Sequence, residues 1–577
     1  MNYINFSKAS CKNCYKCLRS CPVKAIRFKN QQAEIVEERC IACGHCLEVC
    51  PQNAREIIND LDIVKGALIS GKKVIVSIAP SFMGYMNVEE GKVVAGLKKI
   101  GFTTIEETAI GADAVTRYYK EYLQKNNIEN YITTACPSAN YMIEKYYPGL
   151  IKYMIPIDSP MIAHGKILKS IYGSDCFIVF IGPCAAKKIE ADEYRENIKD
   201  VIDAVLTFDE IKMWLQEKNI DLNSIKSEKF NKNSFKQGAG FPVKGGIIKA
   251  LEDVIDEKSL ETISVSGTNN CIKIFESMKK GNIKGAFIEI NVCEGSCVGG
   301  PNSTKYEDDY YTRLHKVKEY IKRKKKSINL QECSNEELNT LELEIDFSTS
   351  FRDKTFKDRI PSEEDIRRIM NEMGKFESED ELNCGVCGYN TCRKKAEAIF
   401  KGMAETDMCL HFMRSKAESL SNVIVESTES SIILVDRDMK IKEINPAAQE
   451  VFMVKSENIK GKPVSLLMRD EDIRRVKETG KSIIGKKDAY PQYNAVFIKN
   501  IVYLPKQNVV LVSMINVVES EMQRKELIKV KENTLNVAQE VIEKQMRVAQ
   551  EIAGLLGETT AETKVILNKL RKVVAGE

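Results

Sequence analysis

Cysteine is the residue type with the most chemistry to offer in this sequence. The 577-residue chain has 19 cysteines but only four histidines and one tryptophan. Its N-terminus has no apolar signal segment and no run is long enough to span a bilayer, so we expect a cytoplasmic protein outside the membrane. In a reducing compartment, cysteines serve metal binding or redox chemistry rather than disulfides. A formal net charge of +4 over this length does not indicate nucleic-acid binding. The run RKKK at 323–326 is more simply explained as the solvent-exposed part of a helix or linker.

The N-terminal region contains two copies of the run C-x2-C-x2-C-x3-C-P, namely CKNCYKCLRSCP and CIACGHCLEVCP. This run is typical of two-cluster ferredoxins, in which the fourth cysteine of each run ligates the other cluster. We therefore expect one 4Fe–4S cluster on Cys11, Cys14, Cys17 and Cys50, and another on Cys21, Cys40, Cys43 and Cys46. Zinc binding explains two complete tandem copies poorly. Two such clusters form an electron conduit and imply a redox centre further along the chain.

A third cluster site is predicted by the run CGVCGYNTC and one later cysteine. Its ligands would be Cys384, Cys387, Cys392 and Cys409. A four-cysteine zinc site is the alternative on spacing alone. The segment resembles the small 4Fe–4S domain of several anaerobic redox proteins, which favours the cluster.

Four further cysteines are dispersed, each following a predicted buried strand: Cys136, Cys184, Cys293 and Cys297. A lone cysteine is usually a packed thiol. Here, however, the last two share a glycine-rich loop, and Lys187 follows Cys184 in PCAAKKIE. Loops leaving the carboxyl ends of strands are where α/β folds place ligands.

The elements that would position these residues indicate a multidomain α/β and α+β protein, since the chain is too long for one core. Residues 60–310 alternate apolar strand patterns with helical ones, and 362–376 has the serine cap of a short helix. We expect five regions: a two-cluster ferredoxin-like domain (1–58), an α/β domain (59–325), a 4Fe–4S domain (362–415), a small sensor-like domain (420–516) and C-terminal helices (517–577).

Residues 1 to about 310 resemble the FeFe hydrogenases, whose catalytic domain carries loop motifs matching TACPS, PCAAKKIE and EINVCEGSCVGGP. The resemblance implies that Cys136, Cys184, Cys293 and Cys297 hold a 4Fe–4S cluster, which Cys297 bridges to a diiron centre with CO, cyanide and an azadithiolate, together called the H-cluster. Lys187 would hydrogen-bond a cyanide, a task suited to a buried ammonium that is otherwise uncompensated. Ala79, Pro80 and Ser81 match the loop near the dithiolate. The cofactors would then be three 4Fe–4S clusters and the H-cluster; Cys176, Cys271 and Cys333 remain as ordinary packed or surface thiols.

The sequence departs from the family at the proton path. Ala135 stands where catalytic members have a proton-relay cysteine, and Gly182 where they commonly have methionine. The helix expected to carry the path's glutamates reads TRYYKEYL, with Glu121 as the carboxylate nearby. General acid–base relay contributes a factor of about 10² to 10⁴. These departures argue against high flux rather than against H2 binding.

Residues 420–516 resemble a PAS domain, with a strand–turn–strand pattern, an N-P-A helix start and the later segment IKGKPVSLL; another small sensor-like fold is the alternative. This segment has no histidine, cysteine or tryptophan, which disfavours haem or a flavin adduct. Leu535, Ile542, Ala549 and Leu556, with Ala538, Gln545 and Ile552 between them, form a weak heptad seam. After it, Gly557 ends the helix, and Thr559 and Glu562 form a capping box.

This domain series resembles the sensory FeFe hydrogenases of anaerobes, which implies slow reaction with H2 and protons and transfer of redox state to the PAS-like domain for signal transduction. The implied partners are a ferredoxin-like electron carrier, a second copy of the chain bound through the PAS-like domain and terminal helices, and a separate kinase or phosphatase. A metabolic ferredoxin-dependent hydrogenase is one alternative. An iron–sulfur assembly protein without the diiron centre is the other; Lys187 and the complete third loop count against it.

Overall fold

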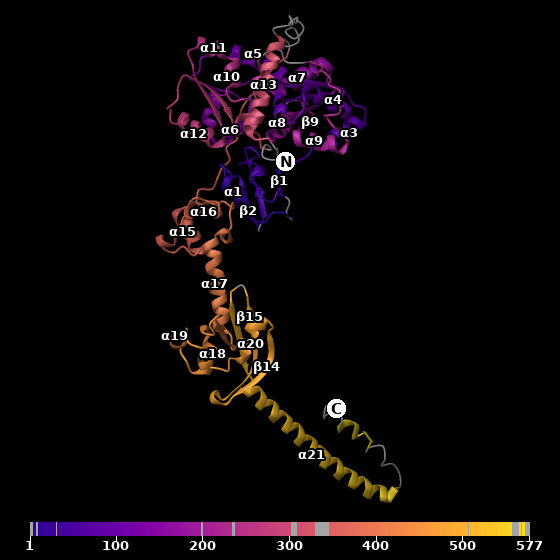
Figure 1. Cartoon of the computed structure of the whole chain (residues 1–577), viewed down its shortest axis with the longest axis vertical. Helices are drawn as coiled ribbons and strands as arrows, with labels where there is room; N and C mark the ends of the chain where they lie inside the picture. The colour runs from indigo at the N-terminus through magenta and orange to yellow at the C-terminus, as the bar shows by residue number, and fades with distance from the viewer. Residues whose placement is uncertain are drawn as a thin grey trace. The chain divides into compact units, whose positions relative to one another are not determined.

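The computed structural model describes residues 4–6, 10–30, 32–197, 200–232, 237–301, 308–328, 345–505, 507–556, 565–566 and 568–571. The chain divides into two compact units, Met1–Met413 and Arg414–Glu577 (Figure 1). The first unit contains every predicted cysteine ligand.

The ferredoxin-like module is an internal repeat of a short helix followed by a strand. Its elements are β1 (Ile4–Phe6), α1 (Lys16–Ser20), β2 (Ile26–Lys29), β3 (Gln32–Ile35), α2 (His45–Glu48) and β4 (Arg55–Ile57). The pairs β1–β4 and β2–β3 are antiparallel. Tyr15 and Gly44 precede α1 and α2 in the same left-handed conformation, with φ of 56° and 73°. The two cysteine runs therefore fold alike.

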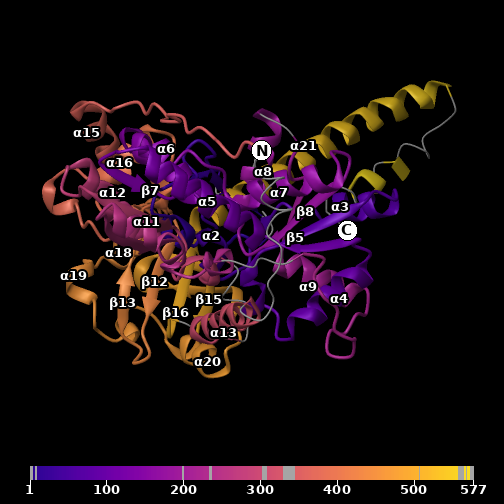
Figure 2. The same ribbon diagram turned by 90° about the horizontal axis from the view of Figure 1, so that it is seen from above.

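The larger domain holds a four-stranded parallel sheet in the order β6-β5-β8-β9. Its strands are β5 (Val74–Ile78), β6 (Thr104–Glu107), β8 (Phe177–Gly182) and β9 (Ala204–Thr207). Strand β5 is buried on both faces, with Val74, Val76 and Ile78 on one side and Ile75 on the other. The first face packs against α3 (Leu61–Ile69), α4 (Glu90–Ile100), α9 (Phe208–Glu217) and α13 (Tyr310–Ile328); the second packs against α7 (Pro160–Tyr172) and α8 (Ala186–Asn197) (Figure 2).

A second parallel sheet of the same domain has the order β10-β11-β7. Its strands are β7 (Asn130–Ile132), β10 (Glu261–Ser266) and β11 (Ala286–Asn291). One face packs against α6 (Pro137–Tyr146) and α12 (Thr268–Lys279), and the other against α5 (Ala109–Lys125), α10 (Gly246–Ala250) and α11 (Glu252–Glu257). The predicted buried strands and α/β architecture are therefore confirmed. The division of the strands between two sheets was not evident from the sequence.

Residues 345–361 lack extended regular structure and lie before the third cysteine group. Phe347 is fully buried, and its carbonyl accepts a hydrogen bond from the Asp158 backbone N–H at 2.9 Å. The predicted short helix is α15 (Glu363–Glu372), which begins with a capping box between Ser362 and Asp365. It is followed by α16 (Cys392–Phe400) and α17 (Leu410–Ser427), the second of which starts directly after Cys409.

The RKKK run lies at the end of α13, as the plainer interpretation expected. Lys324 packs inward and its ammonium lies 3.3 Å from the Glu107 carboxylate.

The second unit contains a five-stranded antiparallel sheet in the order β13-β12-β16-β15-β14. The strands are β12 (Ser431–Val435), β13 (Ile441–Ile444), β14 (Ile483–Tyr490), β15 (Ala495–Leu504) and β16 (Val509–Asn516). Between β13 and β14 lie α18 (Pro446–Phe452), α19 (Ser456–Ile459) and α20 (Glu471–Thr479), whose apolar side chains complete the core. Asn445 caps α18 through the Ala448 N–H, as the N-P-A pattern predicted.

The predicted C-terminal helix is α21 (Val518–Leu556). Val541, Val548 and Ile552 are at least half exposed along it. The predicted helix end at Gly557 and the capping box of Thr559 and Glu562 lie outside the described residues. In the described part of the chain, no helix is both long and apolar enough to cross a membrane.

Candidate metal centres

The four dispersed cysteines lie close enough together in the first unit to influence one another's pKa. Cys136 precedes α6, Cys184 lies between β8 and α8, Cys293 follows β11, and Cys297 lies in the short helix Ser296–Gly299. Burial raises the pKa of Cys184 to about 11 and that of Cys297 to about 12, and the adjacent Cys136 thiol adds to both rises. Binding of a metal by these thiols would therefore release protons.

A cavity of about 100 Å³ adjoins this group. Ala79, Pro80, Ser81, Ala135, Cys184, Lys187, Asn291 and Cys297 are among the residues that line it. The structure thus brings together the residues that the family resemblance implied, from both sheets. Most of the lining is apolar, so a bound group would be shielded from water.

Lys187 reaches this cavity but is not an uncompensated cation, so the reasoning that gave it no partner was wrong. Its ammonium donates to Glu190 Oε2 at 2.6 Å and to Ser159 Oγ at 2.8 Å. A longer contact of 3.4 Å joins it to the Ala135 carbonyl. Glu190, one helical turn after Lys187, neutralises a charge that would otherwise be costly to bury.

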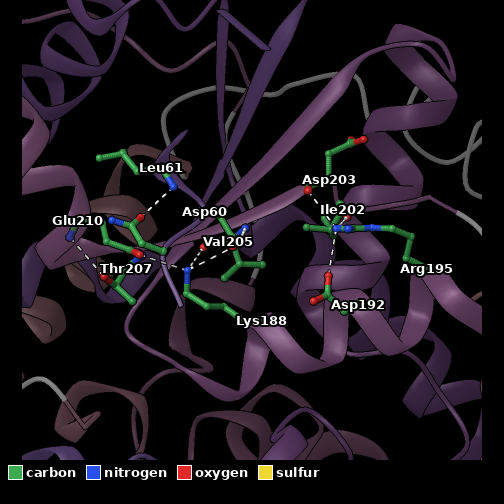
Figure 3. Close-up of polar contacts among 11 residues, drawn as sticks. Asp60, Leu61, Lys188, Asp192, Arg195, Ile202, Asp203, Val205, Thr207 and Glu210 are labelled. Carbon is green, nitrogen blue, oxygen red and sulfur yellow. Dashed lines mark hydrogen bonds and ion pairs between the residues drawn. The ribbon is translucent and has the colours of Figure 1, made fainter. Parts of the chain in front are cut away.

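Lys188 lies in the first turn of α8, shortly after Cys184, and its ammonium is surrounded by oxygen atoms of other elements (Figure 3). Its side chain is 1% exposed and lies 3.3 Å from Glu210 Oε1 and 3.6 Å from Asp60 Oδ2. It also donates to the Val205 carbonyl. Because Glu210 caps α9 through Thr207, this buried lysine connects α8 to β9 and α9.

The departures at the proton path have structural counterparts. Behind Ala135, Tyr119 Oη lies 2.9 Å from Thr134 Oγ1 and accepts from the Thr134 N–H at 2.8 Å. Burial raises the pKa of Tyr119 to about 12, so this chain of groups is neutral. Glu121 instead faces Lys125 at 3.4 Å on the outer side of α5. Two carboxylates lie near the site, the partly buried Glu190 and the buried Glu289. The sequence reasoning missed both because they lie on other elements.

At Gly182 the space of a side chain is already filled. A Cβ there would lie 2.6 Å from the Phe180 ring, which also lines the cavity. The aromatic ring therefore occupies the position beside the cavity where a methionine would extend.

The ferredoxin-like module packs directly against this site. The Ala25, Ala42 and Ala54 N–H groups each donate to a cysteine sulfur at 3.3 Å, namely Cys21, Cys40 and Cys50. Next to Cys43, a Cβ on Gly44 would lie 2.6 Å from the Pro301 side chain, which follows the third loop. Cys43 is also close enough to Cys293 to influence its pKa. The module and the four-cysteine site are therefore immediate neighbours.

The third cysteine group surrounds a small hollow lined by Cys384, Cys387, Cys392 and Cys409. Lys395 is 1% exposed beside it, and burial lowers its pKa although Cys409, Cys387 and Cys392 oppose that change. A buried cation beside four thiols fits an anionic metal–thiolate group. Within the described residues, no three His, Cys, Asp or Glu side chains converge as ligands of a single metal ion.

This third group packs on the ferredoxin-like module. Lys24 Nζ donates to the Leu18 carbonyl at 2.9 Å and to the Gly388 carbonyl at 3.0 Å. Arg19 donates to the Val386 carbonyl at 2.9 Å. The cysteine groups are thus linked in series within the first unit, with the ferredoxin-like module between the other two.

Comparison with known proteins agrees with this arrangement. Residues 72–301 match the family model described as the iron only hydrogenase large subunit, C-terminal domain; residues 3–51 match a 4Fe-4S dicluster domain, and residues 380–411 match a model for an Fe-S cluster segment. Iron hydrogenase 1 of Clostridium pasteurianum is 28% identical over 52% of this chain and 64% of the relative. The periplasmic [Fe] hydrogenase large subunit of Nitratidesulfovibrio vulgaris is 26% identical over 55% of this chain and 91% of its own length. The nuclear prelamin A recognition factor of Xenopus laevis is 24% identical over 51% of this chain and 80% of its own length.

The chain contains a domain of the FeFe hydrogenase-like family, which spans residues 72–301. It is accordingly an iron–sulfur protein of hydrogenase type, and the match leaves more than a third of Clostridium pasteurianum iron hydrogenase 1 uncovered. The family includes both hydrogenases and proteins with other names, so membership alone does not establish turnover of H2.

The hydrogenase-like cavity fits the group that this family implies. Ser81 Oγ and Asn291 Nδ2 line it, and both are buried without a hydrogen-bond partner among the described residues. Together with the Lys187 ammonium they offer donors to a ligand with acceptor atoms, while Cys297 offers a thiolate at the cavity wall. When bound, a diiron centre would supply H2 cleavage; the chain's residues would hold it, offer it hydrogen bonds and exclude water.

Two of the three remaining cysteines are packed thiols outside these groups. Cys176 is 4% exposed and packs against the second face of the four-stranded sheet. Cys271 is fully buried, and its sulfur lies 3.5 Å from the Asn291 carbonyl, which places it behind the cavity as a packed thiol. Cys333 lies outside the described residues.

Proposed function

We propose that the chain is an H2 sensor, which reacts slowly and reversibly with H2 at an H-cluster and passes its redox state to the PAS-like domain. Its H-cluster ligands would be Cys136, Cys184, Cys293 and Cys297, with Cys297 bridging to the diiron centre. The observation that carries the proposal is Ala135. Its methyl group lines the cavity beside Cys297 and Lys187, where a proton-relaying thiol would be needed for rapid turnover.

The surroundings of Ala135 support slow chemistry. The neutral pair Tyr119 and Thr134 lies behind it, and neither hydroxyl ionises near neutral pH. The Phe180 ring closes the cavity wall at Gly182. Lys187 would hold the diiron centre by hydrogen bonding, with Glu190 keeping the ammonium charge balanced.

The succession of cysteine groups supports transfer of electrons away from the site. From the H-cluster an electron would pass to the cluster on Cys21, Cys40, Cys43 and Cys46, since Cys43 lies next to Cys293. It would continue to the cluster on Cys11, Cys14, Cys17 and Cys50 and to the third cluster on Cys384, Cys387, Cys392 and Cys409. A ferredoxin-like protein would exchange electrons with this series.

The second unit supports an output role. Its antiparallel sheet and intervening helices have the element order expected for a PAS-like domain, and α21 carries exposed apolar side chains. We propose that two copies associate through this domain and α21, and that a separate kinase or phosphatase reads the result.

Infrared and paramagnetic resonance spectroscopy of matured protein test the proposal. Protein supplied anaerobically with the diiron centre should show CO and cyanide bands, and H2 should reduce all three 4Fe–4S clusters. Hydrogen–deuterium exchange in residues 414–556 should then differ with and without H2. Cys384→Ala should abolish that difference while H2 still reduces the ferredoxin-like clusters, whereas Cys176→Ala, which removes a cysteine outside the sites, should behave as wild type.

Each alternative predicts a different outcome. Rapid H2 oxidation, with exchange in the second unit insensitive to H2, would favour a metabolic hydrogenase. No CO or cyanide bands after competent maturation would reject both hydrogenase functions. The remaining candidate would then be an iron–sulfur assembly role, which is favoured by the 33% identity of a 97-residue segment to the cytosolic Fe-S cluster assembly factor of Kluyveromyces lactis.

A further inference from the structure

The two halves of the ferredoxin-like module differ at one buried position. The segments CPVKAI (21–26) and CPQNAR (50–55) occupy matching places after the two cysteine runs. In each, the alanine N–H donates to the sulfur of the preceding cysteine at 3.3 Å, from Ala25 to Cys21 and from Ala54 to Cys50. The next residue is Ile26 in the first half and Arg55 in the second, and these are only 2% and 6% exposed.

Arg55 begins β4, where it pairs with Phe6 of β1, and its side chain turns inward to the cysteines. Its guanidinium lies within electrostatic reach of the Cys17 sulfur. It also lies within electrostatic reach of the Cys40 and Cys46 sulfurs. Cys17 belongs to one proposed cluster, and Cys40 and Cys46 belong to the other. The cation therefore lies between the two cluster sites.

A charge in this position has a direct effect on electron affinity. A 4Fe–4S group with four thiolates is anionic, and each one-electron reduction adds a further negative charge without making or breaking a bond. Net charge, burial and hydrogen bonds to sulfur set the reduction potential of such clusters. A buried cation stabilises the reduced form more than the oxidised form because Coulomb energy is less screened away from water.

We propose that Arg55 raises the reduction potentials of both clusters in the ferredoxin-like module. Electrons that leave the hydrogenase-like site would therefore be held on these two clusters. The inference rests on the proposed cluster sites and deepens the proposed function. Ile26, its counterpart in the repeat, leaves the matching position without charge. The two halves therefore differ in buried charge at this position, although their cysteine runs are alike.

A redox titration of the full chain tests this role. The protein is reconstituted with iron and sulfide but without the diiron centre, and reduction by dithionite is followed by paramagnetic resonance. Arg55→Met should lower the equilibrium constant for one-electron reduction of the module's clusters at least tenfold at fixed potential, which equals 59 mV for a one-electron couple. Arg55→Lys should retain most of the wild-type value. The third cluster, on Cys384 and its partners, should titrate unchanged in every variant.

Two further variants separate charge from packing and from hydrogen bonding. Ile26→Met places the same side chain at the matching position of the first half and should leave both potentials within about twofold in the equilibrium constant. Arg55→Gln keeps a hydrogen-bond donor but removes the charge, so it should behave like Arg55→Met. Potentials in Arg55→Met and Arg55→Gln equal to those of Ile26→Met would overturn the proposal. So would reconstituted wild type whose iron content shows no clusters in the module, which would also reject the cofactor assignment. Failure of H2 to reduce the protein, by contrast, concerns only the proposed function.

Discussion

Substitution of Gly44 by alanine should loosen the contact between the ferredoxin-like module and the hydrogenase-like domain. Gly44 has φ of +73°, and an added Cβ would lie 2.6 Å from Pro301 Cβ and 2.8 Å from Pro301 Cγ. The left-handed backbone costs a residue with a Cβ about 1–2 kcal/mol. Overpacking against the proline ring adds about 1–3 kcal/mol, because that ring cannot rotate away. The two effects together give a destabilisation of about 2–5 kcal/mol.

Gly71→Ala is the matched control. Gly71 has nearly the same φ, +71°, but nothing lies within 4 Å of its added Cβ, so only the backbone cost of about 1–2 kcal/mol applies. The assay is the guanidinium concentration at which anaerobic holoprotein loses half of its iron–sulfur absorbance. A second measurement is the rate of electron transfer from the proposed cluster that includes Cys293 to the ferredoxin-like module. Gly44→Ala should lower both beyond the control. Equal midpoints for the two variants would refute the close packing of Gly44 on Pro301.

Three further predictions concern other contacts. Lys188→Ala should lower the free energy of unfolding by about 3–5 kcal/mol, because it leaves Glu210 and Asp60 without their buried cation, and Lys188→Met should lower it less. The iron retained at the Cys184 site measures both effects, and equal losses of iron in the two variants would contradict the ion-pair explanation. Gly388→Ala would bring a Cβ to 2.8 Å from Leu18 and should weaken the packing of the third cluster segment on the ferredoxin-like module. Gly402→Ala, also at positive φ but with nothing within 4 Å of its Cβ, should leave that packing unchanged. The rate of limited proteolysis between residues 345 and 362 should therefore rise in the first variant only. In the second unit, burial disfavours ionisation of Asp472, but hydrogen bonds from Lys486 at 2.6 Å and Lys499 at 3.0 Å outweigh it and hold its pKa below the ordinary value. A carboxyl group whose pKa is lower in the folded state stabilises the fold at pH values above its ordinary pKa, and this stabilisation is lost as the pH falls through the folded-state pKa. The thermal midpoint of the second unit should therefore fall on acidification below about pH 4 in wild type, and less steeply in Asp472→Asn.

Local patterns in the sequence were enough to predict the elements and the grouping of most cysteines. The runs around Cys11 and Cys40, the buried strand patterns and the Asn445 cap each depend on residues within about a dozen positions, and all appear in the structure as expected. Long-range relations were harder. Glu190 as the partner of Lys187 could have been suspected from its spacing of three residues on a helix.

Other contacts had no local signal. Nothing in the sequence near Gly44 indicates Pro301, and nothing near Gly182 indicates that the Phe180 ring folds over it. The inward direction of Arg55 is a further case, because an arginine after a turn is usually exposed. The ligand sets of the clusters remain predictions, since proximity of thiols does not establish which metal group they bind.

The position of Cys409 has a mechanical consequence. Helix α17 begins at Leu410, so a single peptide bond separates the last cysteine of the third group from the first turn of the helix that leads to the second unit. If the proposed third cluster is bound by Cys409, a change in that bond would act directly on the start of α17, because no loop lies between them. Insertion of a flexible glycine pair at this junction would therefore disconnect the two halves of the protein while leaving every cysteine in place.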